Sequence, residues 1–565
     1  MDLDSSPGHG TPRRRSALAC NTCRERRTKC DGRRPKCSFC IERGKDCFYP
    51  ETQVLPPSSL KVELSRLWEQ IDRITAIAQG QRPRGSSSHD GREGSFTLTA
   101  PRASRGFPFM VMQCEAFVNL LGLEQSMPAL LEQVERGRKA IPAQAYGPNI
   151  VVVDLPEASI LLNAFCEQVH TWYPILHADD TEEFIQAITS CFPLSVTSCL
   201  TLLTLAIGCV MGCNSVLDAL QNRPEALYIE AAMKMLPCAF SHSGPRSAQC
   251  LLLFAIYYLC YGQPFQAYDF AAMASAKLQN YIINELNADS DATQISILTN
   301  CFCEITVQLD LVNTGIHTVA SFVPVPTSSG HWTWGLGQLF ESSTTSDNDN
   351  ESYPERSDQS YFVAEIAIRK MLQRCTWSTS TLADGSYAYA PIVAAELERQ
   401  LDEWLRLLPQ QLSFRPFAAT RSQPGRDPSS AHMEFLRTQY YVFKVSIYWP
   451  AVYEALTAGE ANSDLLCHCA KFFTSFAQFV PSAAAAIAVC KPNLWTLCTS
   501  VFTISMAALV GMTEPCLVGV VPREAILGLE LASKAFDGAA EVSPSLVVMG
   551  AILKESVQRY VCSWM

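Results

Sequence analysis

The chain contains 565 residues, of which 24 are cysteine, and it carries a formal net charge of −11. The charge is segregated, because residues 1–50 hold twelve Lys or Arg against six Asp or Glu, and the remainder is acidic. A compact basic module on an acidic body is expected to bind nucleic acid through that module alone. Residues 1–10 contain no apolar core of a signal peptide, which argues against a secreted, disulfide-bonded protein.

Residues 1–15 are predicted to form a disordered basic arm. The arm ends in three consecutive arginines, Arg13, Arg14 and Arg15. Their side chains suit either contacts with phosphates or recognition as part of a nuclear import signal, and the sequence leaves both interpretations open.

Six cysteines follow at the spacing C-x2-C-x6-C-x6-C-x2-C-x6-C, which is one half-site, C-x2-C-x6-C, used twice. Thiolates suit tetrahedral zinc, and C-x2-C is the loop length that lets two sulfurs bind one ion at about 2.3 Å. Iron–sulfur clusters use four cysteines at other spacings. The predicted zinc ligands are Cys20, Cys23, Cys30, Cys37, Cys40 and Cys47.

Six thiolates exceed the coordination places of one tetrahedral ion, whereas two ions have room for all six if two sulfurs bridge them. The half-sites have equal spacing, so the bridging sulfurs should be equivalent in the two halves. Three pairs meet this condition, and spacing alone does not choose among them. They are Cys20 with Cys37, Cys23 with Cys40, and Cys30 with Cys47.

Basic residues surround these ligands. Residues 24–29 lack Gly and Pro and precede Asp31-Gly32, which predicts about one and a half helical turns that fit a major groove. Arg26, Arg27 and Lys29 are the predicted readers of bases. The predicted phosphate contacts are Arg24, Lys29, Arg33, Arg34 and Lys36. The alternative is that these cations only offset the negative charge of the thiolates.

Residues 19–37, with the ligand spacing, the Asp31-Gly32 pair and Pro35, resemble the fungal binuclear zinc cluster, the Zn2Cys6 DNA-binding domain. We place this domain at residues 16–50. The resemblance implies that Cys20 and Cys37 are the bridging sulfurs. It also implies that Arg26 and Arg27 approach the bases of a CGG triplet. Many members carry Lys at one or both positions, and arginine suits the O6 and N7 acceptors of guanine.

A linker is predicted at residues 51–59, followed by apolar residues at alternating steps of four and three over residues 60–79. This pattern predicts a short coiled-coil dimerisation helix and a homodimer. The seam residues are Leu60, Leu64, Leu67, Ile71, Ile74 and Ala78. No complementary charge pair flanks the seam, so the choice of partner is weakly specified. An amphipathic helix packed on the body is the alternative.

Residues 80–108 are rich in Arg, Ser, Gly and Pro, which predicts a disordered linker. Residues 110–565 show helical periodicity and little strand-like alternation, so we predict a large all-α regulatory domain. The periodic stretches are 160–169, 199–210, 248–261, 270–280, 361–375, 392–408, 437–456 and 463–479. A polar stretch near residues 342–360 is predicted to be a disordered insertion. It would be either an ordinary surface loop or an acidic contact for the transcription machinery.

Four stretches of the body resemble the middle homology region of fungal zinc-cluster regulators: 165–177, which contains Tyr173-Pro174-Ile175-Leu176-His177, then 268–281, 400–409 and 440–450. The sequence departs from that region at two places. Its usual Arg-x-x-Trp-Trp stretch is absent near residues 301–310, and Trp449-Pro450 stands where Arg-Pro is usual.

Residues 493–513 carry no charge and are long enough to span a membrane. Thr and Ser residues dilute this stretch, and Lys491-Pro492 and Glu514-Pro515 bracket it, so we predict a buried helix and no membrane contact.

The body contains no Gly-rich phosphate loop, no G-x-S-x-G and no H-E-x-x-H, so we do not expect an enzyme. Cys301-Phe302-Cys303 and Cys467-His468-Cys469 lack a second ligand pair. We therefore expect these and the other cysteines outside the cluster to be buried thiols.

These features predict a nuclear, sequence-specific transcription regulator, an activator that reads paired CGG-type triplets in double-stranded DNA as a homodimer and engages the transcription machinery. The resemblance also suggests a pathway-specific role, such as control of a metabolic or secondary-metabolite gene cluster. The alternative is an interaction or corepressor scaffold whose zinc module is only a folded handle.

Overall fold

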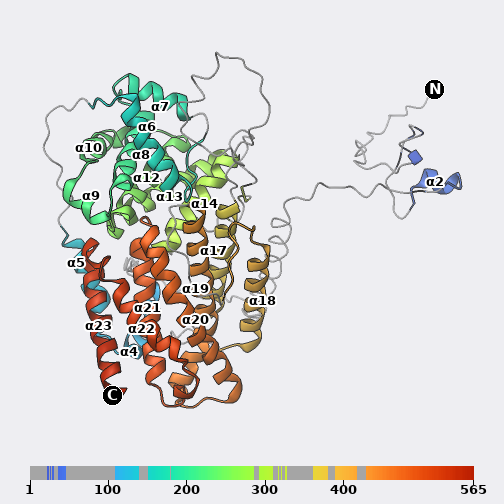
Figure 1. The fold of residues 1–565 in the computed structure, drawn as a ribbon. Helices are drawn as coiled ribbons and strands as arrows, with labels where there is room; N and C mark the ends of the chain where they lie inside the picture. The colour runs from blue at the N-terminus through green and yellow to red at the C-terminus, as the bar shows by residue number, and fades with distance from the viewer. Residues whose placement is uncertain are drawn as a thin grey trace, which may run out of the picture. The chain divides into compact units, whose positions relative to one another are not determined.

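The computed structural model describes residues 22–23, 26, 28, 30, 36–45, 47, 109–138, 151–177, 180–285, 292–309, 316, 320, 323, 325–326, 360–379, 389–416 and 428–564. The chain divides into two compact units, residues 1–66 and 67–565. No β-strand occurs among the described residues, which are mostly helical (Figure 1). The predicted all-α body is therefore confirmed for the described residues. Four other predicted segments lie outside the described residues: the arm at 1–15, the linker at 51–59, the coiled coil at 60–79 and the linker at 80–108.

The first unit contains α2 (Ser38–Glu42). The first half of the second unit contains η1 (Met110–Gln113), α4 (Glu115–Leu120), α5 (Met127–Arg136), α6 (Leu155–Phe165), the π-helix η2 (Cys166–His170), α7 (Asp180–Thr189), α8 (Val196–Gly212), α9 (Val216–Asn222), α10 (Ala226–Lys234), α11 (Leu236–Ser241), α12 (Pro245–Cys260), α13 (Pro264–Glu285) and α14 (Ala292–Gln308).

Its second half contains α17 (Ser360–Thr379), α18 (Pro391–Leu407), α19 (Pro428–Ala458), α20 (Ser463–Val489), α21 (Leu494–Thr513), η4 (Val518–Val520), α22 (Arg523–Ala535), η5 (Ala540–Val542) and α23 (Pro544–Trp564). Five of the eight periodic stretches named from the sequence lie entirely within one helix. The other three extend past the end of a helix: 160–169 continues into η2, and 248–261 and 392–408 each extend by one residue. The predicted insertion near 342–360 lies outside the described residues, except for Ser360.

Helix α8 is the centre of the first half of the body. It has no charged residue, and α6, α10 and α12 pack against it (Figure 1). Ser195 caps its first turn, because the side chain accepts a hydrogen bond from Ser198 N at 3.0 Å. Helix α6 approaches so closely that a Cβ at Gly208 would lie 2.1 Å from the carbonyl oxygen of Leu161. Glycine at this position therefore permits the contact between the two backbones.

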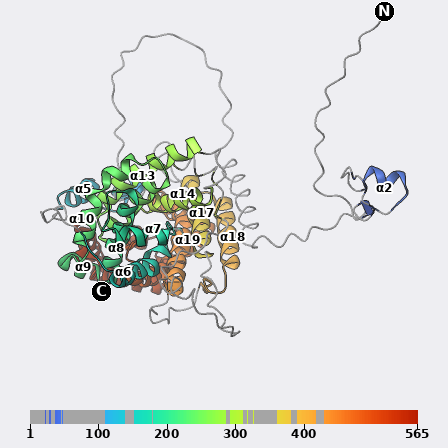
Figure 2. The same cartoon turned by 90° about the horizontal axis from the view of Figure 1, so that it is seen from above.

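The second half of the body is built on the pair α19 and α20, which contact each other along their length and are flanked by α17, α21 and α22. Asn462 caps α20 by accepting a hydrogen bond from Leu465 N at 2.8 Å. Viewed from above, α14 and α17 lie side by side, so they connect the two halves (Figure 2). Among the described helices, α20 and α21 are long and apolar enough to cross a membrane, but 56% and 78% of their apolar windows are buried in the protein. The buried helix predicted at residues 493–513 is α21.

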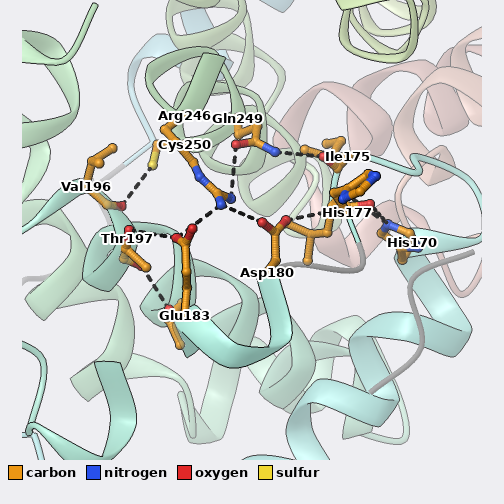
Figure 3. Close-up of polar contacts among 12 residues, drawn as sticks. His170, Ile175, His177, Asp180, Glu183, Val196, Thr197, Arg246, Gln249 and Cys250 are labelled. Carbon is orange, nitrogen blue, oxygen red and sulfur yellow. Dashed lines mark hydrogen bonds and ion pairs between the residues drawn. The ribbon is translucent and has the colours of Figure 1, made fainter. Parts of the chain in front are cut away.

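The segment that follows η2 joins the two halves. His170 Nε2 accepts a hydrogen bond from Leu176 N at 3.1 Å, and Gln249 of α12 donates one to the carbonyl oxygen of Ile175 at 2.8 Å (Figure 3). Tyr173 Oη, which is buried, donates to Asn493 Oδ1 at 3.0 Å, immediately before α21. Polar groups of this segment are thus paired with helices from both halves.

Trp172, in the same segment, packs edge-on against three rings of the second half. The ring centroids lie 5.2 Å from Tyr361, 4.5 Å from His432 and 5.4 Å from Phe435. Such edge-to-face contacts stabilise a core beyond the burial of their area. The aromatic cluster fixes the segment on α17 and α19.

Three charged side chains hold the end of this segment in place. Arg246 Nη2 of α12 lies 2.6 Å from Asp180 Oδ1 and 3.1 Å from Glu183 Oε2, both on α7 (Figure 3). Asp180 Oδ2 also accepts a hydrogen bond from His177 N at 2.8 Å. Burial opposes the charged form of Arg246, but hydrogen bonds and charges from both carboxylates outweigh it and raise the pKa of the guanidinium.

Trp449, one of the departures from the middle homology region, is buried in α19. Its ring lies edge-on to Phe117 of α4, with centroids 5.7 Å apart, and 5.9 Å from Phe472 of α20. Tryptophan at this position therefore provides an apolar contact for α4, which an arginine would not provide.

Asp180→Ala should lower the free energy of unfolding by about 3 kcal/mol, because Arg246 would stay buried with its nearer partner removed. Glu183→Ala is the matched control. This carboxylate binds the same guanidinium but its side chain is 44% exposed, so its loss should cost less than about 1 kcal/mol. Chemical denaturation followed by circular dichroism measures both, and equal losses would show that the buried pair has no special role.

Candidate metal centre and nucleic-acid interface

The interior of the first unit consists of cysteine side chains. Cys23, Cys37 and Cys40 are fully buried and Cys47 is nearly so, while Cys30 and Phe39 pack against them. The described residues of this unit contain no cluster of aliphatic side chains that would form an ordinary core. A module of this kind needs a metal to stabilise its fold.

The sulfur positions suit zinc better than disulfides. Cys23 Sγ and Cys37 Sγ lie 3.7 Å apart, and both lie within 4.8 Å of Cys40 Sγ. A disulfide requires about 2.0 Å between the sulfurs. Two sulfurs bound to one tetrahedral zinc at about 2.3 Å are separated by about 3.8 Å. The observed donors and separation therefore fit thiolates gathered around zinc.

Cys37 is the first cysteine of the second half-site. Its sulfur is close to Cys23 from the first half-site and to Cys40 from the second. Its backbone N–H donates a hydrogen bond to Cys47 Sγ at 3.2 Å, a contact that would orient a thiolate ligand. Cys23 and Cys40 also lie within 4.8 Å of each other, so the sulfur positions do not choose between the pair containing Cys37 and the pair Cys23–Cys40. The predicted partner of Cys37, Cys20, lies outside the described residues.

The two half-sites share two backbone hydrogen bonds as well as their spacing. Each residue of the first has an equivalent seventeen positions later, as Cys20 has in Cys37. Two hydrogen bonds in the first half recur in the second at equivalent positions. They are Arg26 N to Thr22 O (3.3 Å) with Arg43 N to Phe39 O (3.3 Å), and Thr28 N to Cys23 O (3.0 Å) with Lys45 N to Cys40 O (2.9 Å).

The residues at equivalent positions differ between the halves. The equivalents of Arg24, Arg26, Arg27 and Lys29 are Ile41, Arg43, Gly44 and Asp46. The guanidinium of Arg43 lies over the Phe39 ring, 5.7 Å from its centroid. At these four positions the first half therefore carries four cations, whereas the second carries one cation and one carboxylate.

Two of the predicted DNA contacts fall on described residues. Arg26 and Lys36 are both exposed, as contact with DNA requires. The other predicted contacts, Arg24, Arg27, Lys29, Arg33 and Arg34, lie outside the described residues, as do the seam residues Leu60, Leu64, Leu67, Ile71, Ile74 and Ala78.

Sequence reasoning missed Phe39, which packs on the cysteines and holds Arg43. Comparison of the half-sites at an offset of seventeen would have drawn attention to it, because Phe39 replaces Thr22. The cysteines of the body are mostly buried, as expected, and burial raises the pKa of the Cys301 and Cys303 thiols. Cys191, Cys467 and Cys562 are exposed, contrary to the expectation.

Comparison with known proteins agrees with this geometry. Residues 18–54 match the family described as the fungal Zn(2)-Cys(6) binuclear cluster domain. Over 518 residues the chain is 33% identical to ecdB of Aspergillus rugulosus, a relative named as a transcription factor, and the match covers 88% of this chain and 89% of that protein.

Two further relatives match over shorter ranges. The transcription factor FBD3 of Fusarium pseudograminearum is 53% identical over 51 residues, 8% of this chain and 7% of that protein. The transcription regulator galc of Aspergillus niger is 24% identical over 138 residues, 24% of this chain and 16% of that protein. No solved structure matches the chain.

The matched domain binds two zinc ions, for which the cysteines of the first unit are suitable ligands. The long match to a relative named as a transcription factor extends the likeness through the helical body. The chain therefore belongs to the fungal Zn(2)-Cys(6) binuclear cluster transcription factors, which are DNA-binding regulators rather than enzymes.

Proposed function

We propose that this protein reads CGG-type triplets through the first half-site of its zinc cluster and thereby regulates transcription by RNA polymerase II, as an activator. The observation that carries the proposal is the difference between two half-sites of equal spacing that share two backbone hydrogen bonds. Four predicted DNA-contacting positions hold cations in the first, and the equivalent positions hold Ile41, Arg43, Gly44 and Asp46 in the second. Counterion release favours docking of the first half on the phosphates.

In this proposal Arg26 and Arg27 bind guanine, because the guanidinium fork matches the O6 and N7 acceptors in the major groove. Arg24, Lys29, Arg33, Arg34 and Lys36 bind phosphates and fix the register. Cys20 and Cys37 are the bridging ligands, while Cys23 with Cys30 and Cys40 with Cys47 complete the two zinc sites.

The rest of the chain serves the same function. The seam at residues 60–79 pairs two copies, so that two triplets are bound together. The body is a regulatory domain of the middle-homology type that controls activity and engages the transcription machinery in the nucleus. Its support is the packing of the resembling stretches: Trp404 Nε1 of α18 donates to Ala364 O at 3.1 Å, and Tyr440 Oη of α19 donates to Asp402 Oδ1 at 3.1 Å. The regulated genes are proposed to form a metabolic or secondary-metabolite cluster.

Arg26→Ala should weaken binding to a duplex with paired CGG triplets by about 5- to 150-fold, the loss of one guanine contact worth about 1–3 kcal/mol. Arg43→Ala is the matched control, since it removes an exposed arginine at the equivalent position of the second half-site and should change affinity by less than about 3-fold. Fluorescence anisotropy at one fixed salt concentration measures both. Unchanged binding in Arg26→Ala would favour a scaffold protein without sequence readout.

Leu64→Pro should reduce affinity for a duplex with two triplets far more than for a duplex with one, because proline breaks the helix that pairs two copies. Electrophoretic mobility shifts with the two probes compare these affinities. Ser88→Pro, in the predicted linker that follows the helix, is the control. Equal losses on both probes in Leu64→Pro would contradict dimerisation through this segment.

A further inference from the structure

The helical body contains a cavity of about 870 Å³ that is open to solvent and lies between segments that are distant in the sequence. One wall is the turn between α4 and α5 together with the start of α5, the second is the C-terminal part of α21, and the third is one face of α23. The volume lies in the range of about 300–1,000 Å³ that is typical of sites for small molecules.

The walls expose large apolar side chains to the cavity mouth. Leu130 of α5 is 44% exposed and Val547 of α23 is 51% exposed, and both line the cavity. The turn between α4 and α5 depends on Gly122, whose φ is +64° and whose Cβ position has no atom within 4 Å. A glycine at this turn therefore reverses the chain and leaves its edge of the cavity open.

The floor is apolar. The buried residues that line it are Leu121, Met127, Met506, Leu509 and Tyr560. Methionine side chains are flexible and polarizable and adapt to ligands of irregular shape. Tyr560 alone among them carries a polar side-chain group, which is typical of a site that holds an apolar molecule and orients it through few polar groups.

Charged side chains occur only at the exposed rim of the described lining. Arg559 Nη2 lies 3.7 Å from Glu555 Oε1, and both side chains are more than 70% exposed. Glu124, also exposed, accepts a hydrogen bond from Ser126 at 3.2 Å. A charged ligand that reached the floor would lose its hydration without gaining a buried counterion.

From these observations we infer that the cavity between α5, α21 and α23 is a binding site for an uncharged, largely apolar small molecule. The inference does not depend on the proposed DNA readout, because the site is built entirely from the helical body. Binding should stabilise the packing of α23 against α21 and α5, since the ligand would contact all three.

Nile red, an uncharged apolar dye whose emission shifts in apolar surroundings, is the probe. The full-length protein should bind one dye per chain. Ala551→Trp and Leu130→Trp, which fill the cavity from different walls at exposed positions, should each weaken that binding by about tenfold or more. Their matched controls, Ala395→Trp on α18 and Ile160→Trp on α6, add the same ring at exposed helical positions that do not line the cavity and should leave binding unchanged.

Thermal unfolding followed by circular dichroism identifies any variant that fails to fold. If one cavity variant fails to fold, the variant on the other wall tests the site. The site is absent if the full-length protein binds no dye at one-to-one stoichiometry, or if both folded cavity variants bind it as the wild type does. The anionic dye 8-anilinonaphthalene-1-sulfonate should bind about tenfold more weakly than Nile red, and tighter binding would overturn the assignment of an uncharged ligand.

Discussion

Coordination of zinc by cysteine is the interaction on which the DNA-binding unit depends. Its described interior consists of thiol groups with one phenylalanine beside them, so the hydrophobic effect supplies little of the stability of the fold. The sulfur of Cys37 lies near Cys23 of the first half-site and Cys40 of the second, and the proposed bridge between two ions would join the halves at this point. The exposed cations Arg26 and Lys36 would depend on bound zinc for their positions, because the metal replaces an ordinary core.

The body is held together by a different kind of joint. The segment after η2 places Tyr173 on Asn493, Trp172 on rings of α17 and α19, and Asp180 on Arg246. These contacts connect residues that are far apart in the sequence, and most of them are buried. Because a buried polar group must be paired, this segment has little freedom to rearrange unless both halves move with it. Such a joint would carry a change in one half of the body to the other.

Some features were predictable from the sequence and others were not. The long helices α8, α12, α19 and α20 were predictable because an apolar face repeated over several turns is a strong local signal. Short helices such as α9 and α11, and the π-helix η2, lack enough turns to show it. The zinc ligands were predictable because the spacing of the cysteines determines which sulfurs can bind the same ion. The pair Asp180–Arg246 and the cavity were not, because each joins residues brought together only by the tertiary fold.

The proposed bridge requires two zinc ions that share Cys37. Native mass spectrometry of the full chain, which weighs the protein with its metals, should find two zinc ions per chain, and Cys37→Ser should lose both together because each ion would lose a ligand. Cys191→Ser, at an exposed cysteine of the body, is the control and should keep two. One zinc in the wild-type chain, or a stable single zinc in Cys37→Ser, would contradict the shared bridge.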